Sequence, residues 1–450
     1  MKMAEDWKKA EQEAVELLSS LLKINTTNPP GNEIEAAKFI AGRLSKEGIQ
    51  STILESAPGR GNIVARLKGT GEEKPLLLIS HLDVVEANES EWSHGPFSGE
   101  IADGFIWGRG AVDMKNMAAM EIMTMLLLKR SGAPLKRDVI FAGVADEEAG
   151  GSFGAKWLAQ NHPDLIKAEY ALNEAGGFTI HVNGKRYYPI QIAEKGYVWI
   201  KLTARGIPGH GSMPTADNAV VRISRAVDAI AKKGLRMHVT RPVEVFIRSL
   251  AETQTFPTSL AMKGLLSPFF HSFIVKHLVA NKDQARNFTA FLHNTANPTM
   301  LNAGAKVNVV PSSASVTLDC RILPGMNNEK LLAELKEVIG EGIEFEILSS
   351  APPREFDYRT PLFETIKRNV VKADPEGIPV PYMLIAFTDA QHLAGLGIKT
   401  YGFSPIKLGP DLPYTKLPHG IDERIPTEGF LFGLKLFYET VSEFTTQPAG

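Results

Sequence analysis

The sequence predicts an α/β fold, in which a mostly parallel sheet is flanked by helices and interrupted by an inserted α+β domain of ferredoxin-like type. Strand-like and helix-like segments alternate through residues 1–193. Their strands are near-continuous apolar runs, as expected for a sheet buried on both faces. The pattern changes near residue 194 and returns to α/β alternation at about 355. We therefore expect two domains: residues 1–193 with 355–450, and residues 194–354.

The first domain is expected to contain the longer helices and the buried strands. Spacing of apolar residues predicts helices at residues 6–23, 33–47, 114–132 and 152–161. Short apolar runs predict strands at 62–67, 75–80, 138–145 and 170–173. After the insertion, we expect a helix at 361–373, a strand and loop at 398–405 and a final helix at 426–443.

The inserted domain shows the order strand, helix, strand, helix, strand. Strands are predicted at 196–206, 313–323 and 343–349, helices at 217–233 and 328–340, and a further short strand near 299–304, which gives a βαββαβ order. An apolar, aromatic segment with helical spacing interrupts it at about 250–295. Two interpretations stay open: a helical subdomain that buries this face, or a hydrophobic wall over a site for an apolar substrate.

Composition excludes several classes of function. A net charge of -2 gives no electrostatic reason to expect nucleic acid or an anionic membrane as partner. No run of 18 apolar residues predicts a membrane span, and the charged N-terminal helix does not resemble a signal peptide, so we expect a cytoplasmic protein. The one cysteine, Cys320, lies in the alternating stretch SVTLDCRIL and is expected to be a reduced structural thiol.

Polar residues follow several predicted strands at the point where each strand ends. Ligand sites in open α/β sheets lie beyond the carboxyl ends of the strands, so these positions are informative. The residues found there, or in nearby glycine-rich and proline-rich loops, are histidines and carboxylates: His81, Asp83, Asp113, Asp146, Glu147, Glu148, Glu174 and His419. One acidic residue after a strand means little, but a series of such strand and loop ends indicates a shared site.

Such a concentration of carboxylates is repulsive unless cations neutralise it. Two histidines and several carboxylates suit Zn²⁺ or a similar divalent ion, and one carboxylate can bridge two metals. Asp83 is placed to receive the second N–H of a metal-binding His81, with Leu82 between them pointing into packing. Glu147 and Glu148 are adjacent, so in an extended segment one could bind metal while the other serves as general base.

The motifs SHLDVV, GRGAVDMKN, DEEAGG, NEAGG and PHG, in this order, resemble the di-zinc hydrolase family of aminoacylase, acetylornithine deacetylase, succinyl-diaminopimelate desuccinylase and carboxypeptidases G and S. The resemblance runs from residue 10 to residue 445. The helical insertion and the length are most similar to the carboxypeptidase S and N-fatty-acyl-amino-acid hydrolase branch. The resemblance implies a zinc-peptidase catalytic domain with an inserted domain that serves as lid and dimerisation domain.

The resemblance also implies roles in a site with two Zn²⁺ ions, for which Co²⁺ or Mn²⁺ could substitute. One ion would be held by His81, Asp113 and Glu174, and the other by Asp113, Glu148 and His419. Asp83 would orient His81, and Glu147 would take a proton from the metal-bound water and pass it to the leaving nitrogen. The family usually holds the peptide bond after the bridging aspartate in cis, here Asp113–Met114.

Three residues of the inserted domain match lid motifs of the family. GIPGHGSMP places His210 where a histidine stabilises the oxyanion, and in dimeric members this histidine enters the partner subunit's site. VNVVP and LDCR place Asn308 and Arg321 where the family holds its substrate, and a guanidinium suits a carboxylate. The plainer alternatives are a turn for His210 and a solvent-exposed strand position for Arg321.

The sequence therefore predicts a metal-dependent amidohydrolase that cleaves N-acyl amino acids or C-terminal peptide bonds, with a homodimer through the lid domain left open. One alternative is another reaction of the same family: succinyl-diaminopimelate desuccinylase, acetylornithine deacetylase or dipeptidase. The remote alternative is a binding protein without catalysis, which would be expected to lack Glu147 or a ligand. The sequence retains all of them.

Overall fold

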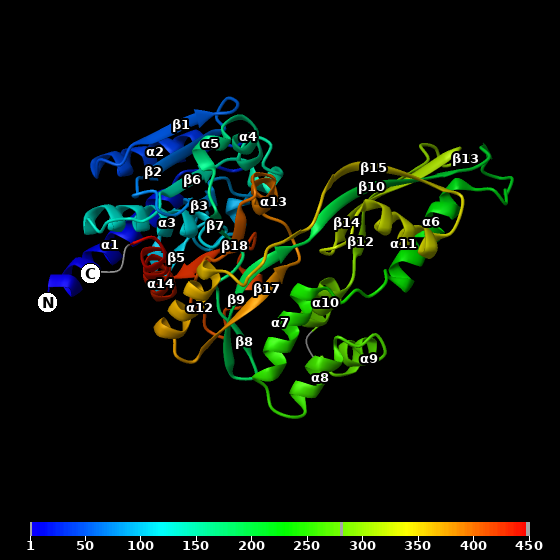
Figure 1. The fold of residues 1–450 in the computed structure, drawn as a ribbon. Helices are drawn as coiled ribbons and strands as arrows, with labels where there is room; N and C mark the ends of the chain where they lie inside the picture. Colours follow the sequence, from blue (N-terminus) through cyan, green and yellow to red (C-terminus); the bar gives the residue numbers. More distant parts are fainter. Residues whose placement is uncertain (1, 280–281, 447–450) are drawn as a thin grey trace. The chain divides into compact units, whose positions relative to one another are not determined.

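The computed structural model describes residues 2–279 and 282–446. It consists of two compact units, coloured along the chain in Figure 1. The first unit comprises residues 1–192, 356–381 and 388–450, and the second comprises 193–355 with the short segment 382–387. Among the described helices, none combines the length and the apolar character needed to cross a bilayer.

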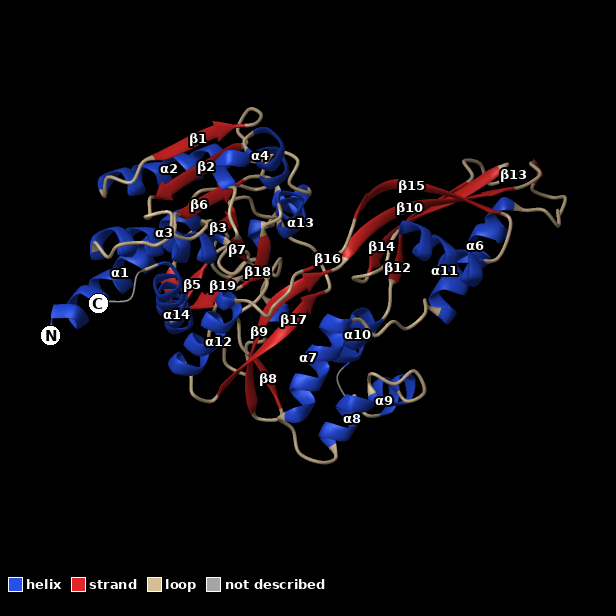
Figure 2. Ribbon diagram, viewed as in Figure 1, coloured by secondary structure: helices blue, strands red, loops and turns tan. Residues whose placement is uncertain are grey.

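The first unit is built on one large sheet, seen in red in Figure 2. Its strand order is β1 (Ser51–Glu55), β2 (Gly61–Leu67), β6 (Val139–Val144), β3 (Leu76–His81), β7 (Tyr170–Asn173), β18 (Lys399–Gly402) and β9 (Lys185–Glu194). The central strands β6, β3, β7 and β18 are parallel, whereas β1, β2 and β9 are antiparallel to their neighbours. β8 (Ile180–Val182) and β17 (Gly377–Leu384) pair with β9, and β16 (Arg354–Glu355) pairs with its last two residues. The predicted α/β class is confirmed.

Helices cover both faces of this sheet. Alternate strand residues such as Leu77 and Ile79 pack with α4 (Ala155–Asn161), α5 (Pro163–Ile166) and α13 (Ala390–Leu393). On the other face lies α3 (Lys115–Ser131), which packs against α1 (Lys2–Leu22) and α14 (Thr427–Thr445). α2 (Glu33–Lys46) packs on β1 and β2, and α12 (Pro361–Ala373) packs on α14. All residues of β3 and β6 are buried, which explains their continuous apolar sequences.

A small antiparallel sheet joins two distant parts of the chain. It contains β4 (Ile101–Ala102), β5 (Phe105–Trp107) and β19 (Arg424–Pro426). Arg424 pairs with Trp107, so the loop that follows β5 lies beside the loop that precedes β19. This pairing brings together the two segments that carry Asp113 and His419.

The second unit contains an antiparallel sheet of order β12 (Thr295–Ala303), β14 (Ser313–Ile322), β10 (Gly196–Arg205) and β15 (Ile343–Ala351). Helices α6 (Ala219–Lys233) and α11 (Asn328–Ile339) contribute to its apolar core. This is the ferredoxin-like βαββαβ arrangement that the sequence predicts. Cys320 lies fully buried in the core, and burial raises the pKa of its thiol to about 12, so it is a structural thiol.

The helical insertion within this unit comprises α7 (Arg241–Glu252), α8 (Thr258–Gly264), α9 (His271–His277) and α10 (Lys282–Leu292). α7 buries an apolar face that includes Phe246 and Leu250, as the first interpretation requires. Phe256 and Phe269, however, are 81% and 91% exposed. Burial within a helical subdomain therefore accounts for part of the segment, and a role of the exposed phenylalanines in a site stays a prediction.

The strands of the structure that were not expected from the sequence include β1, β9 and β17 of the large sheet. β9 contains Pro189 and β17 contains two prolines, which weaken the local strand signal. Both acquire their conformation from pairing with other strands of the sheet.

Leu82, between His81 and Asp83, points into packing as predicted, with none of its side chain exposed. We expect Leu82→Ala to lower the free energy of unfolding by about 2–5 kcal/mol, because it removes buried methyl groups and leaves a cavity. Denaturant titration measures the change. Leu260→Ala is the matched control, since Leu260 is 63% exposed and its loss is expected to change stability by no more than about 0.5 kcal/mol. Equal losses for the two variants would contradict the assignment.

Candidate metal centre

Histidines and carboxylates from distant parts of the sequence meet at the carboxyl ends of β3, β6 and β7. His81 is the last residue of β3, Glu148 follows β6, and Glu174 follows β7 directly. Asp113 arrives on the loop after β5, and His419 on the loop before β19. The peptide bond between Asp113 and Met114 is cis, as the resemblance implied.

Two groups of potential metal ligands share Asp113. His81, Asp113 and Glu174 form one group and Asp113, Glu148 and His419 the other, with the ligand atoms of each within 4.8 Å of one another. Nε2 of His81 lies 3.1 Å from Oδ1 of Asp113 and 3.9 Å from Oε2 of Glu174. Nε2 of His419 lies 3.2 Å from Oδ2 of Asp113 and 3.1 Å from Oε2 of Glu148. Each oxygen of Asp113 thus faces a different histidine.

These distances fit a pair of divalent ions. Ligands that bind Zn²⁺ at about 2.0–2.1 Å in tetrahedral geometry lie about 3.3 Å from one another. The contacts to His81 and His419 range from 3.1 to 3.9 Å. Imidazole nitrogens and carboxylate oxygens are ligands that zinc and similar metals accept, and a shared aspartate is typical of two-metal sites. The residues present therefore fit two ions bridged by Asp113.

The electrostatics of the side chains alone favour a cation. Burial first, and then the charge of Glu174, raises the pKa of Glu147 well above its ordinary value. Burial likewise raises the pKa of Glu148 and of Glu174, to which the charge of Asp113 adds. Hydrogen bonds to Asp113 and Glu148 raise the pKa of His419 to about 10. A divalent ion would replace these protons and neutralise the carboxylates.

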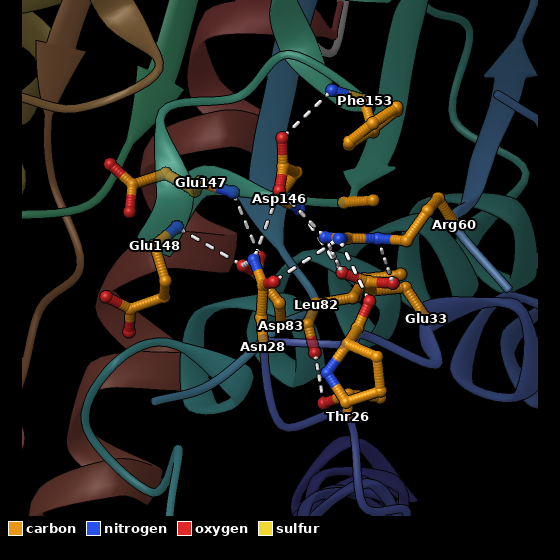
Figure 3. Close-up of polar contacts among 12 residues, drawn as sticks. Thr26, Asn28, Glu33, Arg60, Leu82, Asp83, Asp146, Glu147, Glu148 and Phe153 are labelled. Atoms are coloured by element: carbon orange, nitrogen blue, oxygen red, sulfur yellow. Dashed lines mark hydrogen bonds and ion pairs between the residues drawn. The ribbon is translucent and has the colours of Figure 1, made fainter. Parts of the chain in front are cut away.

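Glu147 and Glu148 lie on a tight turn rather than in an extended segment, so that expectation is wrong. Glu147–Ala149 forms one turn of 3-10 helix, and it follows Asp146, whose φ is 70°. In Figure 3 both carboxylates point away from Asp83, while both backbone N–H groups point toward it. Among the described residues Glu147 belongs to neither ligand group, which leaves its half-buried carboxylate available for proton transfer.

The carboxylate of Asp83 holds this turn. Its Oδ1 accepts the backbone N–H of Glu147 at 3.1 Å, and its Oδ2 accepts that of Glu148 at 3.2 Å and the side-chain amide of Asn28 at 2.8 Å. Nδ1 of His81 lies 3.0 Å from the backbone oxygen of Asp83 and 3.5 Å from its Oδ1. Asp83 therefore contacts His81 mainly through its carbonyl, and its carboxylate serves the glutamates.

A buried ion pair that sequence reasoning missed connects the Asp113 and His419 loops. Arg109 donates to Oε2 of Glu423 at 2.7 Å, and Oε1 of Glu423 accepts the backbone N–H groups of Val112 and Asp113 at 2.8 and 3.1 Å. Arg109 also donates to the carbonyl of His419 at 3.4 Å. The sequence did contain a signal for this ion pair. Arg109 lies inside GRGAVDMKN and Glu423 lies just after PHG, and these two motifs carry the proposed ligands Asp113 and His419.

The three residues predicted in the inserted domain lie in the second unit. His210 is in β11 (Gly209–His210), which pairs with β13 (Val309–Val310) beside Asn308, and both side chains are exposed. Arg321 lies near the other end of β14, about 27 Å along the strand from Ser313 at about 3.4 Å per residue. Its guanidinium pairs with Asp319 at 2.8 and 3.0 Å and faces the Phe387 ring. Within this unit His210 and Asn308 therefore lie close together, whereas Arg321 lies apart from them.

Comparison with known proteins gives a consistent result. The model of Peptidase family M20/M25/M40 matches residues 77–443. N-fatty-acyl-amino acid synthase/hydrolase PM20D1 of Mus musculus is 29% identical over 83% of this chain and 75% of its own length. Aminoacylase-1 of Sus scrofa is 26% identical over 99% of both chains. Probable carboxypeptidase S-like 2 of Dictyostelium discoideum is 29% identical over 84% of this chain and 74% of its own.

Solved structures share the fold. The M20 family metallo-carboxypeptidase Sso-CP2 from Sulfolobus solfataricus superposes with a TM-score of 0.73 at 19% identity and covers 95% of this chain and 98% of its own. The YXEP protein of Bacillus subtilis, a dinuclear metal-binding peptidase, has a TM-score of 0.59 at 13% identity and covers 97% and 99%.

Metal binding is expected to release protons. His419 has a pKa of about 10, so its imidazole carries a proton at pH 7, and the pKa of His81 is also raised, whereas a metal binds the neutral ring. The apparent affinity for Zn²⁺ should therefore rise with pH, by about tenfold per pH unit for each proton displaced. Isothermal titration of metal-free protein with Zn²⁺ in two buffers of different ionisation enthalpy measures the protons released.

The His419→Ala variant is the control for this measurement and should release fewer protons than the wild type. An affinity that does not change between pH 6 and pH 8 would contradict the assignment of these histidines as ligands.

Proposed function

The chain belongs to peptidase family M20/M25/M40, and on that premise we propose that it hydrolyses the amide bond of N-acyl amino acids or the C-terminal bond of peptides. The observation that carries the proposal is the pair of ligand groups that share Asp113, with the carboxylate of Glu147 on the adjoining turn. The names of the relatives favour this substrate class, because aminoacylases, N-fatty-acyl-amino acid hydrolases and carboxypeptidases all cleave an amide next to an amino acid.

We propose zinc as the resident metal, with Co²⁺ or Mn²⁺ as substitutes. His81, Asp113 and Glu174 would hold one ion, and Asp113, Glu148 and His419 the other. A ligand set of imidazoles and carboxylates without thiolate supports this choice. When bound, such ions acidify water and polarise the carbonyl of the scissile amide.

Glu147 is proposed as the general base. Its half-buried carboxylate, whose pKa is raised by its surroundings, is suited to accept a proton from the attacking water and to deliver it to the leaving nitrogen. Asp83 fixes the turn through the backbone N–H of Glu147, so the carboxylate of Glu147 is not what holds the turn. The products would be a carboxylic acid and an amine, the latter an amino acid.

His210, Asn308 and Arg321 are proposed to act on the substrate in a homodimer. His210 would stabilise the oxyanion, and Arg321 would pair with the substrate carboxylate, for which it must share or release Asp319. The separation of His210 from Arg321 within the second unit supports a dimer, because these two residues of one chain are too far apart to contact the same small substrate, whereas His210 of the partner subunit could do so.

Bulky or fatty acyl groups are the proposed preference. The supporting observation is the exposed aromatic surface of the helical insertion, with Phe256, Phe269 and Phe270 more than half exposed. Apolar pockets are the usual means of binding such groups. A desuccinylase would need several cationic residues in its substrate pocket instead.

Glu147→Gln is expected to lower kcat by about 10²- to 10⁴-fold, because the amide cannot accept the proton from water. The fold and the content of bound metal should be unchanged, since Glu147 belongs to neither ligand group among the described residues. Steady-state hydrolysis together with metal analysis tests this. Near-normal turnover of the variant would refute the role of Glu147.

Removal of metal with a chelator should abolish wild-type activity, and zinc, cobalt or manganese should restore it.

A set of N-acyl amino acids with acyl chains from acetyl to oleoyl tests the substrate preference. We expect kcat/KM to rise with chain length, because each buried methylene contributes about 0.8 kcal/mol. Release of the free amino acid measures the rate. Faster cleavage of acetyl or succinyl substrates would favour a deacetylase or desuccinylase instead.

A further inference from the structure

Arg60, the residue before β2, lies at the centre of a buried polar cluster next to the candidate metal centre (Figure 3). Its Nε and one terminal nitrogen donate to the two carboxylate oxygens of Glu33 at 3.0 and 2.6 Å. The same terminal nitrogen donates to Oδ1 of Asp146 at 3.0 Å. The other terminal nitrogen donates to Oδ1 of Asn28 at 3.3 Å and to the carbonyl of Pro30 at 3.2 Å. Arg60 is 6% exposed, so its guanidinium is buried within this cluster.

Arg60 determines which way the amide of Asn28 points. A guanidinium can only donate, so it must face the amide oxygen, and the amide nitrogen is then turned to the opposite side. That nitrogen donates to Oδ2 of Asp83 at 2.8 Å and to Oδ1 of Asp146 at 3.2 Å. Arg60 therefore acts on Asp83 through the orientation of Asn28.

Asp146 is the second route from Arg60 to the site. Its carboxylate accepts from Arg60 and from the backbone N–H of Phe153, and its own N–H donates to Glu33 at 3.3 Å. Its φ of 70° is unfavourable for a residue with a side chain, so these contacts hold the backbone where the turn begins. Glu147 is the next residue in the chain.

The backbone at Gly31 packs closely against Arg60. Gly31 has a φ of 84°, and a Cβ there would lie 2.6 Å from the guanidinium carbon and 2.8 Å from Glu33. Glu33 and Asp146 are buried carboxylates that share this one guanidinium, since its fork reaches both. A lysine could contact one of them as a point charge but could not pair with Glu33 through two parallel bonds.

We propose that Arg60 is a positioning residue for the metal centre. Through Asn28 and Asp146 it fixes Asp83 and the turn, and so aims the carboxylates of Glu147 and Glu148. Without Arg60, the ion that Glu148 would hold should bind more weakly and turnover should be slower, while the affinity for substrate stays the same. The effect on turnover rests on the proposed hydrolytic function, whereas the effect on ion affinity does not.

The test compares Arg60→Met and Arg60→Lys with the wild type. Zn²⁺ titration of the metal-free protein should show one of two ions bound about 10- to 100-fold more weakly in Arg60→Met, the usual effect of removing a residue that supports a ligand. Hydrolysis should show kcat lowered by about the same factor, with KM within about threefold of the wild type, and Arg60→Lys should lie between the two. Arg66→Met is the control, because Arg66 is on β2, the strand that follows Arg60, and pairs with Asp138 at 2.9 Å, away from the turn.

The proposal is overturned if Arg60→Met keeps wild-type ion affinity and kcat, or if Arg66→Met changes both to the same extent. If circular dichroism shows that Arg60→Met does not fold, Arg60→Lys decides: wild-type values for both quantities overturn the proposal, and a weakened ion with lowered kcat supports it. A wild type without hydrolytic activity would defeat the proposed function, and the zinc titration would still decide the role of Arg60.

Discussion

Negative charge that is held out of water is the constraint on which the rest of this structure depends. At the carboxyl ends of three adjacent strands the chain brings together five carboxylates, of which Asp83 is fully buried and the other four are partly buried: Asp83, Asp113, Glu147, Glu148 and Glu174. Burial is the largest cause of the raised pKa of each of the three glutamates, which means that each resists ionisation. The site is stable only with protons or cations among these groups. A pair of divalent ions would supply that positive charge among these carboxylates.

The residues around the site compensate its charge with hydrogen bonds and a buried ion pair. Asp83 is satisfied by two backbone N–H groups and an amide, and the pKa of this fully buried carboxyl remains lowered because hydrogen bonds outweigh burial. Arg109 and Glu423 connect the loops of Asp113 and His419 as a buried pair. Removal of one partner of such a pair leaves an uncompensated charge and typically costs about 3–5 kcal/mol. Precise placement of the ligands and the stability of this end of the unit are therefore coupled.

The sequence was sufficient for the parts of the site that follow from strand ends. His81 and Glu174 could be predicted to meet because parallel strands deliver their carboxyl ends to one edge, and the ferredoxin-like order followed from strand and helix succession. Arg60 and Asn28 could not be predicted, because their partners lie 27 to 118 residues away along the chain and no periodicity encodes such a contact. β9 and β17 were missed because their prolines obscure the pattern. The turn at Glu147 depends on the backbone conformation of Asp146. Contacts of Asp146 with Glu33 and Arg60 determine that conformation.

Cys320 gives the chain a practical property. Its thiol is fully buried in the core of the second unit, and burial raises its pKa to about 12, so the nucleophilic thiolate is scarce at neutral pH. The chain has no other cysteine. A cysteine introduced at an exposed position would therefore be the one thiol that a maleimide dye or a nitroxide label modifies. Val307, fully exposed beside Asn308, is such a position, and a label there would report on the ribbon that carries His210 without prior removal of a native cysteine.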